Sequence, residues 1–111
     1  MKALVITQFN AEGFHNYPSA PTSVAFLSHE HRHTFVVRCC YAVDDLNREK
    51  EIFLCREAVQ EYLQESFGAP CQFENRSCEM IAQEIMEFGA DDNMVWCEVW
   101  EENTGGARVE K

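Results

Sequence analysis

The chain has 111 residues, a length that fits one domain with a single hydrophobic core rather than two domains. Apolar residues make up 46% of the chain and aromatic residues 12%, which indicates a folded globule and not a disordered acidic tail. The formal charge of −10 argues against nucleic acid or an anionic membrane as a partner, because both would repel the protein.

No segment of the sequence predicts export or membrane insertion. The apolar stretch at residues 3–6 is too short for a signal peptide, and nothing approaches the ~20 apolar residues that cross a bilayer. Six cysteines are present without any Cys-x-x-Cys pair, and Cys39 and Cys40 are adjacent in a strand-like run. We therefore expect a cytoplasmic protein with free, buried thiols and no zinc site built from cysteines.

The first half of the chain predicts two strands separated by a loop. Residues 3–9 are rich in β-branched and aromatic side chains and indicate the first strand. Residues 10–28 contain Pro18 and Pro21 and are predicted as a loop. Residues 31–43 form the second strand, with one apolar face at a spacing of two residues: Phe35, Val37, Cys39, Tyr41 and Val43.

The second half predicts two helices and two further strands. After a charged turn at residues 44–50, apolar residues recur every three or four positions and indicate a helix that ends at residues 68–70. Ser77 is placed to cap a second helix, and Gly89 to end it. Residues 93–100 alternate like a strand, and residues 107–109 follow as a short last strand.

The predicted order of elements is β-β-α-α-β-β within one domain, residues 1–111. This order is typical of an α+β fold in which an antiparallel four-stranded sheet carries two helices on one face. Trp96 and Trp100 are expected to pack in the core or at an interface rather than to stack on a ligand.

All four histidines lie in the first third of the chain, and their spacing predicts a metal site. His31 and His33 are two residues apart at the start of a strand, so their imidazoles project from the same face. His15 can supply a third nitrogen if the first two strands pair. His29 and His31 form a rival pair with the same spacing, which leaves the choice of strand ligands open.

Four segments in the same order resemble the 6-pyruvoyl-tetrahydropterin synthase and 6-carboxy-tetrahydropterin synthase family. Residues 31–38 (HRHTFVVR) resemble its His-Gly-His strand, and residues 9–15 (FNAEGFH) are similar to its Phe-x-Ala-x-His opening with a short insertion. Residues 75–82 (NRSCEMIA) look like its second helix start, and residues 99–107 (VWEENTGGA) like its Val-x-Glu ending. The resemblance spans nearly the whole chain.

The resemblance implies the tunnelling fold (T-fold) and a zinc ion held by His15, His31 and His33, which polarises the side chain of a substrate. It also implies homo-oligomers, as trimers stacked into hexamers, whose sheets close into a barrel with active sites at subunit boundaries.

The same resemblance implies the ligand and the residues that hold it. Glu101 matches the glutamate that binds a pterin or purine-like ring, such as that of dihydroneopterin triphosphate or a deazapurine precursor. A carboxylate can accept two parallel hydrogen bonds from the amino group and ring N–H of such a ring. Ser77 and Cys78 match positions that contact the same ring.

The family's catalytic base has no counterpart in this chain. Leu27 stands four residues before His31, where the family has a cysteine, and residues 64–73 lack the Asp-His pair that activates it. Arg32 also replaces the middle glycine of His-Gly-His. Three readings stay open: an enzyme whose base is rebuilt from His29, Glu30 or Cys71, a non-catalytic binder that keeps the pocket, or an oligomeric interaction protein.

Overall fold

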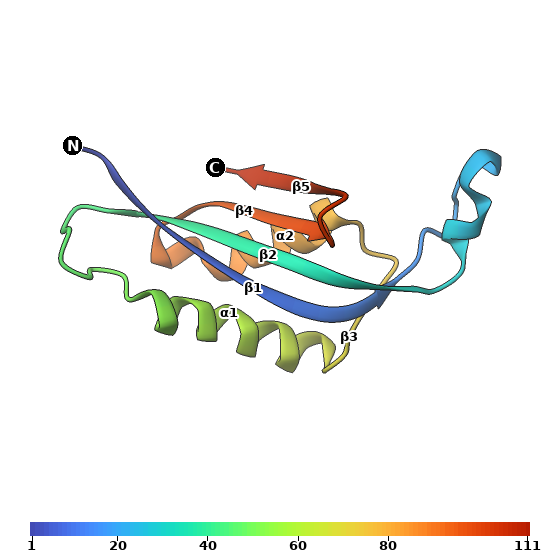
Figure 1. Ribbon diagram of the computed structural model, residues 1–111, viewed down its shortest axis with the longest axis horizontal. Coiled ribbons are helices and arrows are strands. Elements are labelled where there is room, and N and C mark those ends of the chain that lie inside the picture. Colours follow the sequence, from blue (N-terminus) through green and yellow to red (C-terminus); the bar gives the residue numbers. More distant parts are fainter.

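The computed structural model describes all 111 residues as a five-stranded sheet with two α-helices (Figure 1). The strands lie in the order β3-β1-β2-β4-β5. All neighbouring pairs are antiparallel except β1 and β3, which are parallel. The elements in chain order are β1 (Ala3–His15), the 3-10 helix η1 (Thr22–Ser28), β2 (His31–Val43), α1 (Ile52–Phe67), β3 (Cys71–Glu74), α2 (Cys78–Phe88), the 3-10 helix η2 (Ala90–Asp92), β4 (Met94–Glu101) and β5 (Gly105–Glu110).

The α+β class is confirmed, but the expectation of a four-stranded, fully antiparallel sheet is wrong. The additional strand, β3, lies between the two helices in sequence and pairs with the end of β1. It has four residues, of which Cys71 and Phe73 are buried and the other two are exposed. So short an alternation does not distinguish a strand from a loop, and only pairing with β1 makes it part of the sheet.

β1 is longer than the predicted strand of residues 3–9, and the predicted loop therefore begins too early. The strand continues to His15 because it pairs residue by residue with β2, from Ala3 opposite Val43 to His15 opposite His31. Gly13 weakens the sequence signal but is required by packing. A Cβ atom there would lie 2.9 Å from a ring carbon of Phe73 and 3.0 Å from the carbonyl oxygen of Cys71.

Both α-helices pack against the same side of the sheet. α1 contacts β1 and β3, and α2 contacts β4 and β5. The core lies between the sheet and the two helices. It contains four of the five β2 side chains predicted for the apolar face; the fifth, Val43, is only partly buried and lies outside the core. Phe35 is fully buried among the four. Burying a side chain of this size contributes about 1.5–3 kcal/mol.

The predicted ends of α2 are confirmed. The Ser77 hydroxyl accepts a hydrogen bond from the backbone N–H of Met80 at 3.1 Å, and Gly89 follows the last helical residue. α1 begins at Ile52, where the Glu51 carboxylate accepts hydrogen bonds from two backbone N–H groups. Ser77 thereby fixes the start of α2 beside the last residue of β1 and the first residue of β2, where the candidate site lies.

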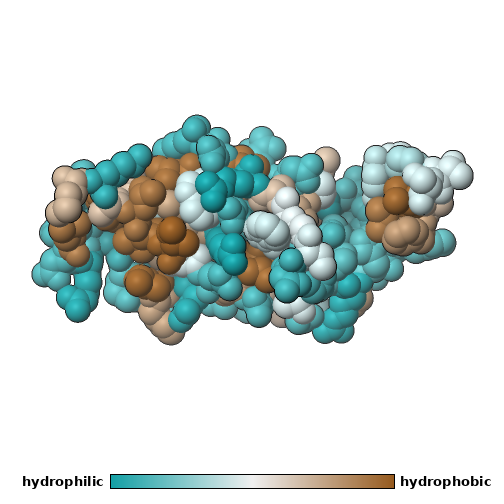
Figure 2. Space-filling view, turned by 45° about the horizontal axis from the view of Figure 1, so that its top comes forward, coloured by the Kyte–Doolittle hydropathy of each residue, from teal (hydrophilic) through white to brown (hydrophobic).

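The face of the sheet opposite the helices carries both tryptophans, which do not lie in the core. Arg108 lies over the Trp96 ring with its guanidinium carbon 4.1 Å from the ring centroid, and the Trp100 indole donates to Glu98 at 3.1 Å. Hydrophobic side chains gather toward the N-terminal end of the molecule in Figure 2, and Leu4 and Ile6 are among the exposed apolar residues.

The six cysteines are free, as predicted, and five of them are buried. None of the helices combines the length and the apolar character that a membrane crossing requires.

Candidate metal centre

The three predicted metal ligands converge at one end of the sheet. His15 ends β1 and lies opposite His31, the first residue of β2, while His33 follows two residues later on the same face. Their ring centroids are 4.5 Å apart for His15 and His31, 5.2 Å for His15 and His33, and 5.0 Å for His31 and His33. His29 lies outside β2 and is exposed, so the structure selects His31 and His33 over the rival pair.

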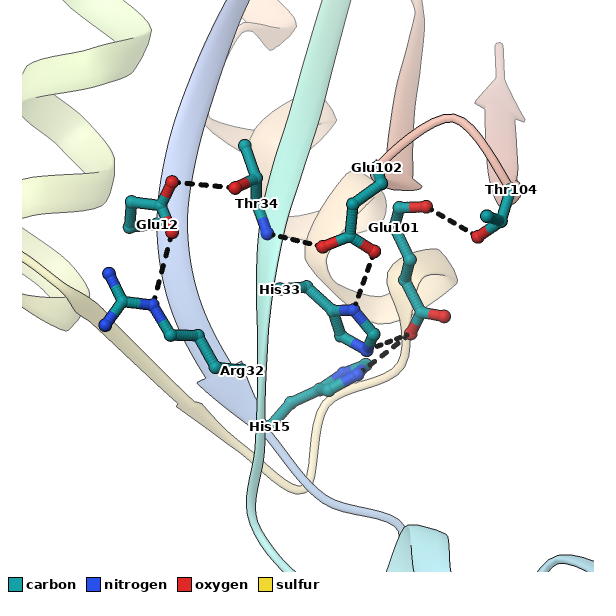
Figure 3. Close-up of polar contacts among 8 residues, drawn as sticks. All are labelled: Glu12, His15, Arg32, His33, Thr34, Glu101, Glu102 and Thr104. Carbon is teal, nitrogen blue, oxygen red and sulfur yellow. Dashed lines mark hydrogen bonds and ion pairs between the residues drawn. The ribbon is translucent and has the colours of Figure 1, made fainter.

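Glu101 lies in the same cluster as the three imidazoles. It is the last residue of β4 and lies opposite Phe35, two residues beyond His33. One carboxylate oxygen lies 2.9 Å from His15 Nε2 and 3.5 Å from His33 Nε2 (Figure 3). One ligand atom from each of the four residues lies within 4.8 Å of the others, so the cluster could hold a metal ion.

The second ring nitrogen of each histidine, Nδ1, is hydrogen-bonded to an oxygen atom. Each Nδ1 lies 2.9 Å from its partner. The partner of His15 is the Arg76 carbonyl, that of His31 is the His29 carbonyl, and that of His33 is a Glu102 carboxylate oxygen. These oxygens accept hydrogen bonds, so each Nδ1 carries the proton and donates it. In the neutral ring this assignment leaves a lone pair on each Nε2, directed at the others, as metal binding requires.

His15 Nε2 provides an independent indication of a cation. The His15 side chain is 8% exposed, and Nε2 has no hydrogen-bond partner, although a Glu101 oxygen lies 2.9 Å away. Burial lowers the pKa of His15, although its hydrogen bond to Arg76 and the charge of Glu101 oppose this shift. A neutral imidazole lone pair facing a carboxylate oxygen is repulsive unless a proton or a metal ion lies between them. The donor set therefore fits a bound metal ion.

A cavity of about 820 Å³ opens beside the histidines. His15, His31 and Glu101 line it together with Ser77 and Cys78. The predicted ring-contacting residues thus share one cavity with two of the predicted metal ligands. Its volume suits a small organic ligand.

The three candidates for a catalytic base do not line this cavity. His29 and Glu30 are exposed, and Cys71 is 3% exposed and borders a different cavity beneath β1. Leu27, at the position of the family's cysteine, does line the main cavity. The catalytic roles of His29, Glu30 and Cys71 stay predictions.

The cysteine that does reach the cavity is not ionised at neutral pH. Burial, with smaller contributions from the negative charges of Glu101 and Glu79, raises the pKa of Cys78 to about 12. Cys78 can therefore contact a ligand as a neutral thiol, but it does not supply a thiolate base.

Sequence reasoning missed Glu102 and the carbonyl group of Arg76. Nothing in the sequence pointed to Glu102, because successive residues of a strand face opposite sides and Glu101 already faces the histidines.

No protein-family model matches the chain, and no curated protein matches it either.

Proposed function

We propose that this protein binds a zinc ion through His15, His31 and His33 and holds a flat, guanine-like bicyclic ligand in the adjoining cavity. A pterin or a deazapurine precursor is the class of ligand that the motif resemblance implies. The observation that carries the proposal is the convergence of three Nε2 lone pairs at a cavity lined by Ser77 and Cys78.

Zinc is the metal that best suits these donors. It is borderline-soft and accepts imidazole nitrogen and carboxylate oxygen, and three histidines with one exchangeable position are typical of catalytic rather than structural zinc. When bound, the ion supplies a Lewis acid that polarises an oxygen atom of the ligand.

Glu101 has two possible roles at this site. It can complete the metal coordination, which its contacts with His15 and His33 support. It can also accept paired hydrogen bonds from a guanine-like edge, as the resemblance implies. A side chain that lines the cavity and also contacts two histidines can exchange one role for the other when a ligand enters.

Binding is supported better than turnover. Proton abstraction beside a carbonyl needs a base within hydrogen-bond reach of the ligand. The cavity has Leu27 where the family has its cysteine, and His29, Glu30 and Cys71 lie outside its lining. These observations favour the second candidate function, a non-catalytic pterin- or purine-binding protein, over a carbon–oxygen lyase.

The metal is tested by elemental analysis of protein expressed with zinc. We expect one zinc ion per subunit in the wild type and loss of zinc in the His31→Ala/His33→Ala double variant. A His29→Ala variant is the matched control and should retain zinc, because His29 contributes only its backbone carbonyl to the cluster. Zinc-free wild-type protein would contradict the proposal.

The ligand is tested by thermal denaturation with neopterin. We expect neopterin to raise the melting temperature of the wild type but not of Glu101→Ala. Glu79→Ala is the matched control, because Glu79 also lines the cavity but lies outside the histidine cluster. Measuring zinc in Glu101→Ala separates the two roles: retained zinc with lost ligand binding indicates a ring contact, and loss of both indicates a metal ligand.

Incubation with dihydroneopterin triphosphate separates an enzyme from a binder. Formation of a 6-pyruvoyl or 6-carboxy tetrahydropterin would show turnover. Binding without product is the result that the cavity lining favours.

A further inference from the structure

We propose that Glu102 is a positioning residue that orients His33 for metal binding, an inference that rests on the proposed metal site. One of its carboxylate oxygens accepts a hydrogen bond from His33 Nδ1 at 2.9 Å. The other accepts from the backbone N–H of Thr34 at 2.7 Å. Both oxygens are thus bonded to consecutive residues of β2, which fixes the carboxylate relative to the imidazole (Figure 3).

The backbone of Glu102 is arranged for this contact. Strict alternation along β4 would direct Glu102 away from the face that Glu101 occupies. Instead Glu102 has a φ of 51°, in the left-handed region that favours glycine or asparagine. Its N–H donates to the Thr34 carbonyl at 2.9 Å, and its side chain turns back toward His33. The left-handed backbone thus places the Glu102 carboxylate where it forms two hydrogen bonds to β2.

Among the three histidines, His33 alone has a charged partner at Nδ1. His15 and His31 donate to backbone carbonyls, those of Arg76 and His29. A carboxylate on the far nitrogen holds the ring and its tautomer, and it makes the metal-binding nitrogen a stronger donor. Glu102 therefore does at His33 what a backbone carbonyl does at the other two histidines.

The chain offers a matched control for this role in Glu74. This glutamate also has a left-handed backbone, with a φ of 59°, and it lies opposite His15 in the β1–β3 pairing. Unlike Glu102, its exposed carboxylate forms no hydrogen bond or ion pair. Substitutions at Glu74 therefore repeat the change in charge and backbone preference without removing a bond to a histidine.

The experiment measures zinc affinity by chelator competition in Glu102→Gln, Glu102→Gly, Glu74→Gln and Glu74→Gly. A glutamine cannot keep both bonds, because its amide nitrogen does not accept from an N–H. We expect zinc affinity to fall about 10- to 100-fold in Glu102→Gly and by a smaller factor in Glu102→Gln, the range found for outer partners of metal-binding histidines. We expect both Glu74 variants to remain within about two-fold of the wild type.

Two further readouts distinguish positioning from general stability. The melting temperature of the metal-free variants reports folding alone. The ¹⁵N shifts of the metal-free His33 ring report its tautomer, and we expect loss of the fixed Nδ1–H form in Glu102→Gly but not in Glu74→Gly. Zinc affinity unchanged in both Glu102 variants, with zinc bound by the wild type, would overturn this inference alone. A wild type that binds no zinc would overturn the proposed function as well.

Discussion

At the scale of single residues, the sheet carries a second polar cluster on the face away from the helices. Glu98 is 7% exposed and accepts hydrogen bonds from Arg108 Nε at 2.8 Å and from the Trp100 indole at 3.1 Å. Arg38 lies 3.4 Å from the same carboxylate. A buried carboxylate is tolerated because its charge is paired and its oxygens are hydrogen-bonded.

This cluster makes stability depend on pH. Burial raises the pKa of Glu98. The hydrogen bonds from Arg108, Trp100 and Arg38 and the positive charge of Arg108 outweigh burial, so the pKa lies below its ordinary value of 4.5. A pKa that is lower in the folded than in the unfolded chain stabilises the fold above the unfolded value, and this contribution is lost as the pH falls through the folded value.

We therefore expect Glu98→Gln to unfold at a lower urea concentration than the wild type near pH 7, with the difference narrowing toward pH 3. Urea denaturation over this pH range measures the effect. Glu110→Gln is the control, because Glu110 is exposed and pairs only with Arg108. An equal difference at both ends of the pH range would show that the Glu98 charge does not stabilise the fold.

At the scale of elements, the junction of β1 and β3 depends on close packing at Gly13. We expect Gly13→Ala to destabilise the protein by about 1–3 kcal/mol, because the added Cβ would overlap the Phe73 ring at 2.9 Å. Chemical denaturation measures the loss. Gly105→Ala is the control, since a Cβ at Gly105 would have no atom within 4 Å. Equal stability of the two variants would mean that β3 moves aside without cost.

The start of α2 joins folding to the site. We expect Ser77→Ala to lower stability by about 1 kcal/mol through loss of the cap on Met80, while Ser77→Asp retains it. Denaturation of both variants checks the cap. If Ser77→Ala matches the wild type, the hydrogen bond contributes nothing to α2, and Ser77 serves only as a cavity-lining residue.

At the scale of the whole molecule, the sheet has two edges and one face without helices. One edge is formed by β3, with four residues, and by residues 3–12 of β1, which pair only with β2; the other is β5, with six residues. Unpaired strand edges favour association with another sheet, and closure into a barrel would remove them. The resemblance to the tetrahydropterin synthase family predicts such an assembly of identical subunits.

We expect the protein to be a trimer or hexamer in solution. Sedimentation equilibrium at several concentrations measures its mass directly, and zinc-free protein provides the comparison that shows whether assembly requires the metal. A monomer at all concentrations would leave the sheet edges unpaired and would contradict this expectation.

Several features could be predicted because neighbouring residues determine them. The burial alternation of β2 places His31 and His33 on one face, since residues two apart in a strand always share one. The ends of α2 were evident because Ser77 and Gly89 act on their own backbone. The shared face of His31 and His33 and the start of α2 beside the cavity could therefore be predicted from residues close to them in the sequence.

Only the tertiary structure decided the rest, because it depends on residues far apart in the chain. The register of β1 against β2 brings His15 opposite His31 and excludes His29 from the cluster. Four residues of β3 become a strand only beside β1. The left-handed backbone of Glu102, which no periodic pattern predicts, turns a second carboxylate toward His33. The sequence by itself thus determined which side chains were available for a metal site, and strand pairing determined which of them meet.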